Sequence, residues 1–276
     1  MANATGNTAA VAPRTAAPRP DYGIDAPPVV RNLLLAGAAG SILWLAAAAR
    51  LWSGAVRVPL GGDTLRIVLA PAALSIGLTC LAMAAWMVWS SKVGKVRERE
   101  QLLDTLTWRG DEQVLDVGCG RGLMLIGAAR RLRTGRAAGI DLWRREDLAG
   151  NAPEATLANA SAERVEDRVT LETADMRTLP FANASFDVIL SQAAVHNVPE
   201  AAGRRAAVEE MARVLRPGGT ILLADIRNLG EYARVLRAAG LDVTLEGSAL
   251  GRMLLGTITF GALRPGVVRA KREAAG

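Results

Sequence analysis

Two stretches near the beginning of the chain contain no charged residue. Residues 32–49 form one apolar run of 18 residues, and residues 67–91 form a second of 25 residues. As helices they would be about 27 Å and about 37 Å long at 1.5 Å per residue, and the hydrocarbon core of a bilayer is about 30 Å thick. We therefore expect two transmembrane helices within residues 29–91. A pair of helices buried in a soluble core is the alternative.

The residues in and around these runs fit a membrane hairpin. Small residues spaced four apart, Gly37 with Ser41 and Ala73 with Gly77, would let the two helices approach closely. Tryptophan favours bilayer interfaces, and four of the six lie in or beside the runs: Trp44, Trp52, Trp86 and Trp89. Basic residues favour the cytoplasmic side, and four follow the second run: Lys92, Lys95, Arg97 and Arg99. We expect a multi-pass protein of the cell membrane whose C-terminal domain faces the cytoplasm.

Three further segments flank the hairpin and the domain. Residues 1–28 are rich in Ala, Pro, Thr and Asn without apolar periodicity, which predicts a disordered tail. Residues 92–107 predict a linker helix with Leu102, Leu103 and Leu106 on its apolar side. Residues 266–276 predict a basic tail, which either adds attraction to anionic lipid or is solvated.

Residues 108–265 alternate short apolar runs with helical patterns. We interpret these runs as the strands and helices of one α/β domain. A helix over residues 229–239 precedes its last two strands. The predicted strands are residues 114–117, 137–141, 169–173, 186–191, 220–223, 243–245 and 257–263.

A glycine-rich loop follows the first predicted strand of this domain. The strand contains Asp116, and the sequence Gly118-Cys119-Gly120-Arg121-Gly122 then leads into a helical run over residues 123–132. Glycine allows a sharp turn and close approach of the backbone to a ligand. A dinucleotide-binding loop would need a third glycine at position 123, where Leu123 stands. The spacing therefore excludes that fingerprint.

The loop resembles motif I of the class I S-adenosylmethionine (SAM) methyltransferases, of the type 11, quinone-biosynthesis-like kind. Further matches follow in order: Asp141 after the second strand, Asp175-Met176 after the third, and a Pro217-Gly218-Gly219 turn before the fifth. The resemblance covers about residues 96–265. It implies a Rossmann-like, seven-stranded sheet of order 3-2-1-4-5-7-6, with SAM as cofactor.

The resemblance also implies a set of cofactor-binding residues. Asp141 is expected to bind the ribose hydroxyls, Asp175 the adenine amino group, and Met176 the face of the ring. The full set is Asp116, Gly118, Cys119, Gly120, Gly122, Asp141, Leu142, Asp175, Met176 and Ser191.

The one histidine of the chain, His196, follows the fourth strand at the sheet edge where ligands bind in open α/β folds. It is the candidate catalytic base; a pocket-wall or substrate hydrogen-bonding role and a structural role remain open. The loop over residues 142–151 is a candidate lid, with Leu142 and Trp143 near the adenosine and Asn151 near the methyl group. A surface loop with Trp143 packed inward is the alternative.

Composition excludes several other classes of protein. The net charge is +6 with a pI near 10.1, but the arginines are scattered and not interleaved with aromatic residues, so we expect no nucleic-acid partner. The two cysteines, Cys80 and Cys119, form neither a disulfide framework nor a metal-binding spacing, and no metal site is expected.

Together these features predict a membrane-anchored SAM-dependent methyltransferase. The expected acceptor is small and apolar, such as a quinone, a lipid or a hydrophobic thiol or phenol, taken from the bilayer. The alternative is a membrane-tethered SAM-binding or scaffold protein without turnover. A homo-oligomer held by the transmembrane helices is a possible assembly.

Overall fold

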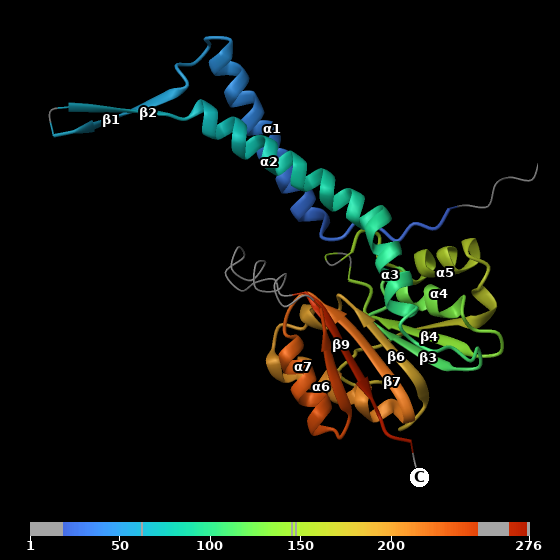
Figure 1. Cartoon of the computed structure of the whole chain (residues 1–276). Helices are drawn as coiled ribbons and strands as arrows, with labels where there is room; N and C mark the ends of the chain where they lie inside the picture. Colours follow the sequence, from blue (N-terminus) through green and yellow to red (C-terminus); the bar gives the residue numbers. More distant parts are fainter. Residues whose placement is uncertain (1–18, 62, 145, 147, 248–264, 275–276) are drawn as a thin grey trace, which may run out of the picture.

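The computed structural model describes residues 19–61, 63–144, 146, 148–247 and 265–274. A long helical hairpin projects from an α/β domain, and a small β-hairpin lies at the far end of the two helices (Figure 1). Residues 1–18, most of the predicted disordered tail, lie outside the described residues.

The two N-terminal helices are α1 (Pro27–Ala48) and α2 (Ala70–Trp89). Only 17% and 11% of their most apolar windows are buried, which does not fit helices of a soluble core. By length and composition, both helices are long and apolar enough to cross a membrane.

The predicted close approach of α1 and α2 through small residues is present. A Cβ at Gly77 would lie 3.1 Å from the carbonyl oxygen of Gly37 and 3.1 Å from the backbone nitrogen of Ser41. A Cβ at Gly40 would lie 2.5 Å from the carbonyl oxygen of Ala73. The glycines therefore set the distance between the helix backbones, as small residues do in membrane helix pairs.

This contact makes Gly40 a test of hairpin packing. We expect Gly40→Leu to lower the stability of the hairpin by about 1–3 kcal/mol, because the larger side chain forces the backbones apart. Thermal unfolding of the full chain in detergent micelles measures the effect. Ala39→Leu, on the exposed side of the same helix, is the matched control and should unfold like the wild type. Equal melting of the two variants would contradict the prediction.

The connection between the two helices is itself structured. It is an antiparallel hairpin of β1 (Ala55–Leu60) and β2 (Asp63–Val68). The first residues of the second apolar run, Ile67 and Val68, therefore belong to a strand, and α2 begins only at Ala70. The alternation of Val and Leu with polar residues, typical of a strand, explains the difference.

The predicted linker helix is a continuation of α2. A π-helical turn, η1 (Ser90–Gly94), joins α2 directly to α3 (Lys95–Leu103). Leu103 is fully buried, with Leu102 and Leu106 packed against the same core. Gly94, the last residue of η1, keeps a helical backbone with φ −60°, so the apolar hairpin and the domain share one continuous helix.

The domain contains the predicted seven-stranded sheet. Its order is β5-β4-β3-β6-β7-β9-β8, in which only β9 runs antiparallel to its neighbours. Numbered from the first strand of the domain, this is the expected 3-2-1-4-5-7-6. The strands are β3 (Gln113–Val117), β4 (Arg136–Asp141), β5 (Val169–Thr173), β6 (Phe186–Gln192), β7 (Leu215–Asp225), β8 (Asp242–Glu246) and β9 (Gly266–Lys271).

Helices cover both faces of the sheet (Figure 1). Side chains of α3, α4 and α5 pack into the core on one face, and those of α6 and α7 pack into the core on the other. The domain helices are α4 (Leu123–Ala129), α5 (Pro153–Ala162), α6 (Ala201–Val214) and α7 (Leu229–Ala238), with short turns η2 (Glu166–Arg168) and η3 (Val195–Asn197).

Two predicted boundaries of the domain were wrong. The supposed basic tail after residue 265 contains β9, which pairs with β7 and β8 inside the sheet, and Arg269 is bonded to Glu246 at 2.7 Å. The last strand had been expected at residues 257–263, which lie outside the described residues. Residues 19–26, expected in the disordered tail, lie against the domain, where Tyr22 is buried.

The Pro217-Gly218-Gly219 segment is part of β7 rather than a separate turn. The pairing of β7 with β6 shifts register there, between Phe186 and Val188. The segment therefore forms an irregularity within the strand, with Gly218 in the left-handed region at φ 80°.

Candidate active site

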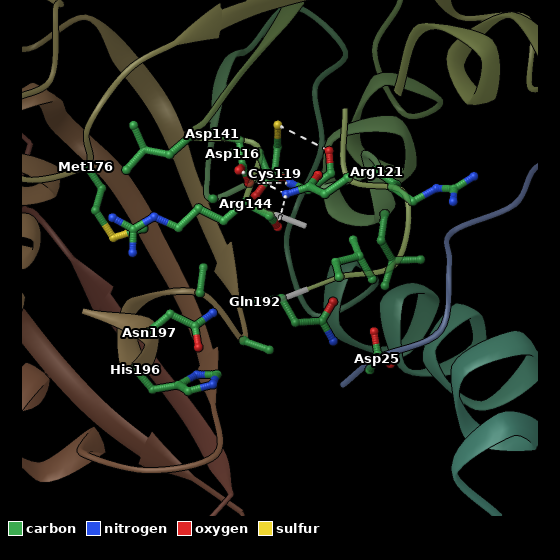
Figure 2. Close-up of a pocket in the computed structure, with 18 of the residues that line it drawn as sticks. Asp25, Asp116, Cys119, Arg121, Asp141, Arg144, Met176, Gln192, His196 and Asn197 are labelled. Atoms are coloured by element: carbon green, nitrogen blue, oxygen red, sulfur yellow. Dashed lines mark hydrogen bonds between the residues drawn. The ribbon is translucent and has the colours of Figure 1, made fainter. Parts of the chain in front are cut away.

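A cavity of about 690 Å³ opens at the carboxyl ends of β3, β4 and β6. Residues from several elements project into it (Figure 2). A volume of this size is typical of sites for small molecules. Nine of the predicted site residues line it: Asp116, Gly118, Cys119, Gly120, Asp141, Leu142, Asp175, Met176 and His196.

Two predicted cofactor residues, Gly122 and Ser191, do not line the cavity. Gly122 caps α4 at φ 83°, and a Cβ there would lie 2.7 Å from the side chain of Thr156. Ser191 is 1% exposed, and its hydroxyl donates to the carbonyl oxygen of Val117 at 2.9 Å. Their contacts indicate that both residues support the glycine loop and the strands behind the cavity.

The glycine loop is shaped by contacts with the neighbouring strand. The backbone N–H groups of Gly118 and Cys119 both donate to the carbonyl oxygen of Ile140 at 2.9 Å. Gly118 and Gly120 have φ values of 74° and 52°, a region that favours glycine. A Cβ at Gly118 would overlap the Cβ of Ala194. The loop therefore presents bare backbone to the cavity.

Asp141 fastens this loop to the next segment. It accepts hydrogen bonds from the backbone of Gly120 at 2.8 Å and of Trp143 at 2.6 Å, and from the Asn151 amide at 3.2 Å. A carboxylate has about four acceptor positions, so at least one remains for a ligand hydroxyl. This arrangement fits the expected ribose contact.

The candidate lid over residues 142–151 is only partly as expected. Leu142 and Asn151 line the cavity, but Trp143 does not. The indole of Trp143 packs against the core and donates to the hydroxyl of Thr173 at 2.8 Å. Asn151 is predicted to lie near the methyl group, yet its amide donates to Asp141, the residue predicted to bind the ribose. The packing of Trp143 fits the alternative, a surface loop with Trp143 packed inward, whereas the position of Leu142 at the cavity fits the lid.

Asp175 and Met176 lie on the side of the cavity formed after β5. Arg177 holds both carboxylate oxygens of Asp175, with its side-chain nitrogens at 2.6–3.0 Å. Hydrogen bonding to Arg177 lowers the pKa of Asp175, so this carboxyl is ionised at neutral pH. Arg144, which the sequence analysis did not single out, extends across the cavity between Asp141 and Met176 (Figure 2).

His196 is held by an acid that the sequence analysis missed. Its Nδ1 lies 2.6 Å from Oδ1 of Asp225, and its backbone N–H donates to Oδ2 of the same carboxylate at 3.1 Å. An ionised carboxylate only accepts hydrogen bonds, so Nδ1 carries the proton and Nε2 is left with a free lone pair. The position of Asp225 at the carboxyl end of the fifth domain strand is the signal that would have indicated it.

The N-terminal segment completes the lining of the cavity. We call residues 21–26 the strap; Tyr22, Asp25 and Ala26 of the strap line the cavity. Ser90, Lys95 and Glu98, from the helix that continues α2, also line it. No motif in the sequence indicated these residues, because their position depends on how two distant segments pack.

Comparisons with known proteins agree with this geometry. Residues 115–223 match the family model described as methyltransferase domain. Methyltransferase GfsG of Streptomyces halstedii is 37% identical over 130 residues, which are 47% of this chain and 43% of that protein. The 27-O-demethylrifamycin SV methyltransferase of Amycolatopsis mediterranei is 32% identical over 153 residues, or 54% of this chain and 49% of that protein.

Residues 115–223 are therefore similar to the methyltransferase domain family. The geranyl diphosphate C-methyltransferase of Streptomyces coelicolor shares the fold of the α/β domain, with a TM-score of 0.53 and 18% identity over 68% of this chain and 84% of that one. The chain spans about half the length of the curated relatives it matches. The family model covers part of the α/β domain and none of the helical hairpin.

The residues present in the methyltransferase domain fit SAM. Gly118 lines the cavity with bare backbone, because a Cβ there would overlap Ala194, and Asp141 keeps an acceptor position for a ribose hydroxyl. Asp175 and Met176 offer a carboxylate and a thioether on the side expected for the adenine. Among the residues that the structure describes, no group of three or more acids, histidines or cysteines has the arrangement of a metal site.

Asp116 is expected to make cofactor binding sensitive to pH. Burial, only partly opposed by a hydrogen bond from Leu125 at 2.8 Å, raises the pKa of Asp116 to about 7. SAM carries a positive charge on its sulfonium, and a positive charge nearby favours the ionised form of a carboxyl group. We therefore expect SAM affinity to fall as pH is lowered from 8 to 6, where Asp116 gains its proton. Calorimetric titrations at pH 6, 7 and 8 measure the change.

Asp116→Asn is the control for this prediction, because the amide does not titrate and keeps the shape of the carboxyl group. Its affinity for SAM should vary less with pH than that of the wild type. An equal slope in both proteins would assign the pH dependence to another group.

Proposed function

We propose that the chain is a membrane-anchored methyltransferase that transfers the methyl group of SAM to a small apolar acceptor drawn from the bilayer. One observation carries the proposal: a single cavity is lined by the glycine loop and also by residues at the domain-side ends of both apolar helices. Ala26 directly precedes α1, and Ser90 directly follows α2. An acceptor that leaves a membrane along these helices would therefore arrive at the cofactor site.

Length and charge support the anchoring. Helices of 22 and 20 residues are about 33 Å and about 30 Å long, close to the thickness of the hydrocarbon core. Of the four basic residues after α2, Lys95 and Arg99 are buried in contacts with the domain and strap, which leaves Lys92 and Arg97 exposed. The positive-inside signal thus rests on two side chains, and the orientation also follows from SAM being a cytosolic metabolite.

The chain supplies positioning and proton transfer. SAM supplies an electrophilic methyl group on a sulfonium. The domain must align the acceptor with that methyl group and exclude water, which together contribute about 7–11 kcal/mol in well-oriented systems. Where the acceptor loses a proton, Nε2 of His196 accepts it, and the carboxylate of Asp225 at Nδ1 stabilises the resulting imidazolium. The relative named for 27-O-demethylrifamycin SV supports a small-molecule acceptor and methylation at oxygen.

A homo-oligomer held by the transmembrane helices is a separate proposal. The glycines of α1 and α2 pack against one another within the chain. A homo-oligomer would therefore use the outer faces of the helices, where large apolar residues such as Leu35, Ile42 and Trp86 are exposed.

Radiolabel transfer tests the function. Full-length protein in detergent is incubated with methyl-labelled SAM and a total lipid extract, and the products are separated by polarity. We expect label in an apolar fraction. We expect no label with the Gly118→Val variant, whose new side chain displaces the loop that faces the cofactor. Label confined to water-soluble products would contradict a bilayer acceptor and leave the methyltransferase assignment intact.

A further inference from the structure

We infer that the strap, residues 21–26, is an integral part of the cofactor site and couples SAM binding to the position of α1. The strap crosses from the domain to the first residue of α1, Pro27, and its side chains reach the same cavity as the glycine loop (Figures 1 and 2). The inference depends on the SAM site alone and is independent of the acceptor.

One end of the strap is bonded to the glycine loop through Asn159 of α5. The Asn159 side-chain oxygen accepts from the backbone N–H of Asp21 at 2.8 Å, and its nitrogen donates to the carbonyl oxygens of Asp21 and Arg121, both at 2.9 Å. Asn159 is 4% exposed. Its amide therefore joins strap and loop directly, and a shift of one moves a hydrogen-bond partner of the other.

Arg121 of the glycine loop makes a second connection. Its guanidinium donates to a carboxylate oxygen of Asp21 at 3.2 Å and to the carbonyl oxygen of Ala149 at 3.0 Å. The segment that contains Ala149 also pairs with the strap, through a bridge between Asp25 and Leu148. The strap, the glycine loop and the 142–151 loop thus surround the cofactor side of the cavity as one bonded unit.

The other end of the strap is bonded to the helix that continues α2. The Lys95 ammonium donates to the carbonyl oxygens of Tyr22 and Gly23 at 2.8 and 2.9 Å, and to the Asp25 carboxylate at 3.0 Å. An ammonium has three donors, and the strap takes all three. Burial lowers the pKa of Lys95, and the Asp25 carboxylate opposes that shift.

A π-helical turn lies at this junction. The hydroxyl of Ser91, within η1, donates to the Asp25 carboxylate at 3.0 Å and accepts from the Asp25 N–H at 3.1 Å. Single π-turns inside α-helices are frequent at functional sites. Since α1 starts at Pro27 and η1 continues α2, the strap is tied to both apolar helices and to the glycine loop.

Coupling of this kind is reciprocal. If the ligand binds only when the strap is bonded to the glycine loop, ligand binding will order the strap. Release of the strap from these contacts will weaken ligand binding by the same factor. The N-terminal segment is therefore expected to change when the cofactor site is filled, although the sequence motifs for SAM lie nearly a hundred residues further along the chain.

Hydrogen exchange on the intact full-length protein in detergent micelles tests this coupling. S-adenosylhomocysteine, the demethylated product of SAM, is the ligand. We expect saturating ligand to slow exchange of the backbone amides of residues 22–26 at least tenfold, together with those of the glycine loop. Amides of β8, at the far edge of the sheet, are the internal control and should not change. Protection of the glycine loop without protection of the strap would overturn the inference.

Substitution of the lysine provides the reverse test. Lys95→Met should weaken SAM binding about tenfold or more, measured by calorimetry, while hydrogen exchange in β3 and β6 stays at the wild-type level. Arg97→Met, on the exposed side of the same helix, is the matched control and should bind SAM normally. A folded Lys95→Met protein with wild-type affinity would overturn the inference.

Ser91→Ala removes only one hydroxyl from the same junction. It replaces Lys95→Met as the test if that variant does not fold. It should weaken SAM binding by about threefold or more, and wild-type affinity would again count against coupling. Neither measurement uses methyl transfer, so a negative result here and failure of the lipid-labelling experiment have separate meanings.

Discussion

Replacement of His196 by alanine is expected to lower turnover by about 10²–10⁴-fold, the range typical of a lost general base. The reason is the pair that His196 forms with Asp225, which fixes the proton on Nδ1 and leaves Nε2 free to accept another. Binding of SAM should change by less than about threefold, because neither residue belongs to the glycine loop. Label transfer at saturating SAM, together with calorimetry, measures the two quantities.

Asp225→Asn provides the matched test of the pair. The amide keeps the shape of the carboxylate but removes the negative charge that stabilises a protonated imidazole. Turnover should fall as well, and the double variant should be little worse than His196→Ala alone, since the two residues act as a unit. Full turnover by the His196→Ala variant with bound SAM would rule out His196 as the base and leave the pocket-wall or structural role.

The second large effect is expected at Gly118. Gly118→Val should weaken SAM binding about 100-fold or more. A side chain at φ 74° costs about 1–2 kcal/mol, and the new atoms would overlap Ala194 and cost about 1–3 kcal/mol in addition. The loop can relieve this strain only by moving from the position that faces the cofactor. Calorimetric titration with SAM measures the loss.

Gly230→Val is the control for this substitution. A Cβ at Gly230 meets no atom within 4 Å, and the residue lies in α7, outside the cavity lining. Its affinity for SAM should equal that of the wild type. If Gly118→Val also bound SAM normally, the glycine loop would not be the element that faces the cofactor.

Features encoded by neighbouring residues were predictable. The glycine loop and the acids at the ends of the strands follow from local patterns, and the order of the sheet follows from the family resemblance that those patterns carry. A parallel sheet gathers the carboxyl ends of its strands at one edge. Asp116, Asp141 and Asp175 accordingly line one cavity. Gly122 and Ser191 belong to the same local motifs, but both residues face the core of the domain and do not line the cavity.

Features that depend on distant segments were not predictable. The strap follows a stretch with no apolar periodicity, and its order comes from Lys95 and Asn159, far along the chain. The strand β9 reads as a basic tail, because its arginine and lysine residues alternate with Val268 and Ala270, whose side chains are buried in the core on the face covered by α6 and α7. In both segments, the order comes from partners that the local sequence does not contain.

The sequence by itself determined a methyltransferase domain with a SAM site and two long apolar helices before it. Those features repeat with the short periods of helices and strands or occupy fixed positions within a few residues. Only the tertiary structure placed Asp225 against His196, closed the strap over the glycine loop and brought the ends of both apolar helices to the cavity. Such contacts join residues far apart in the chain, and they form because burial of the shared core brings their elements together.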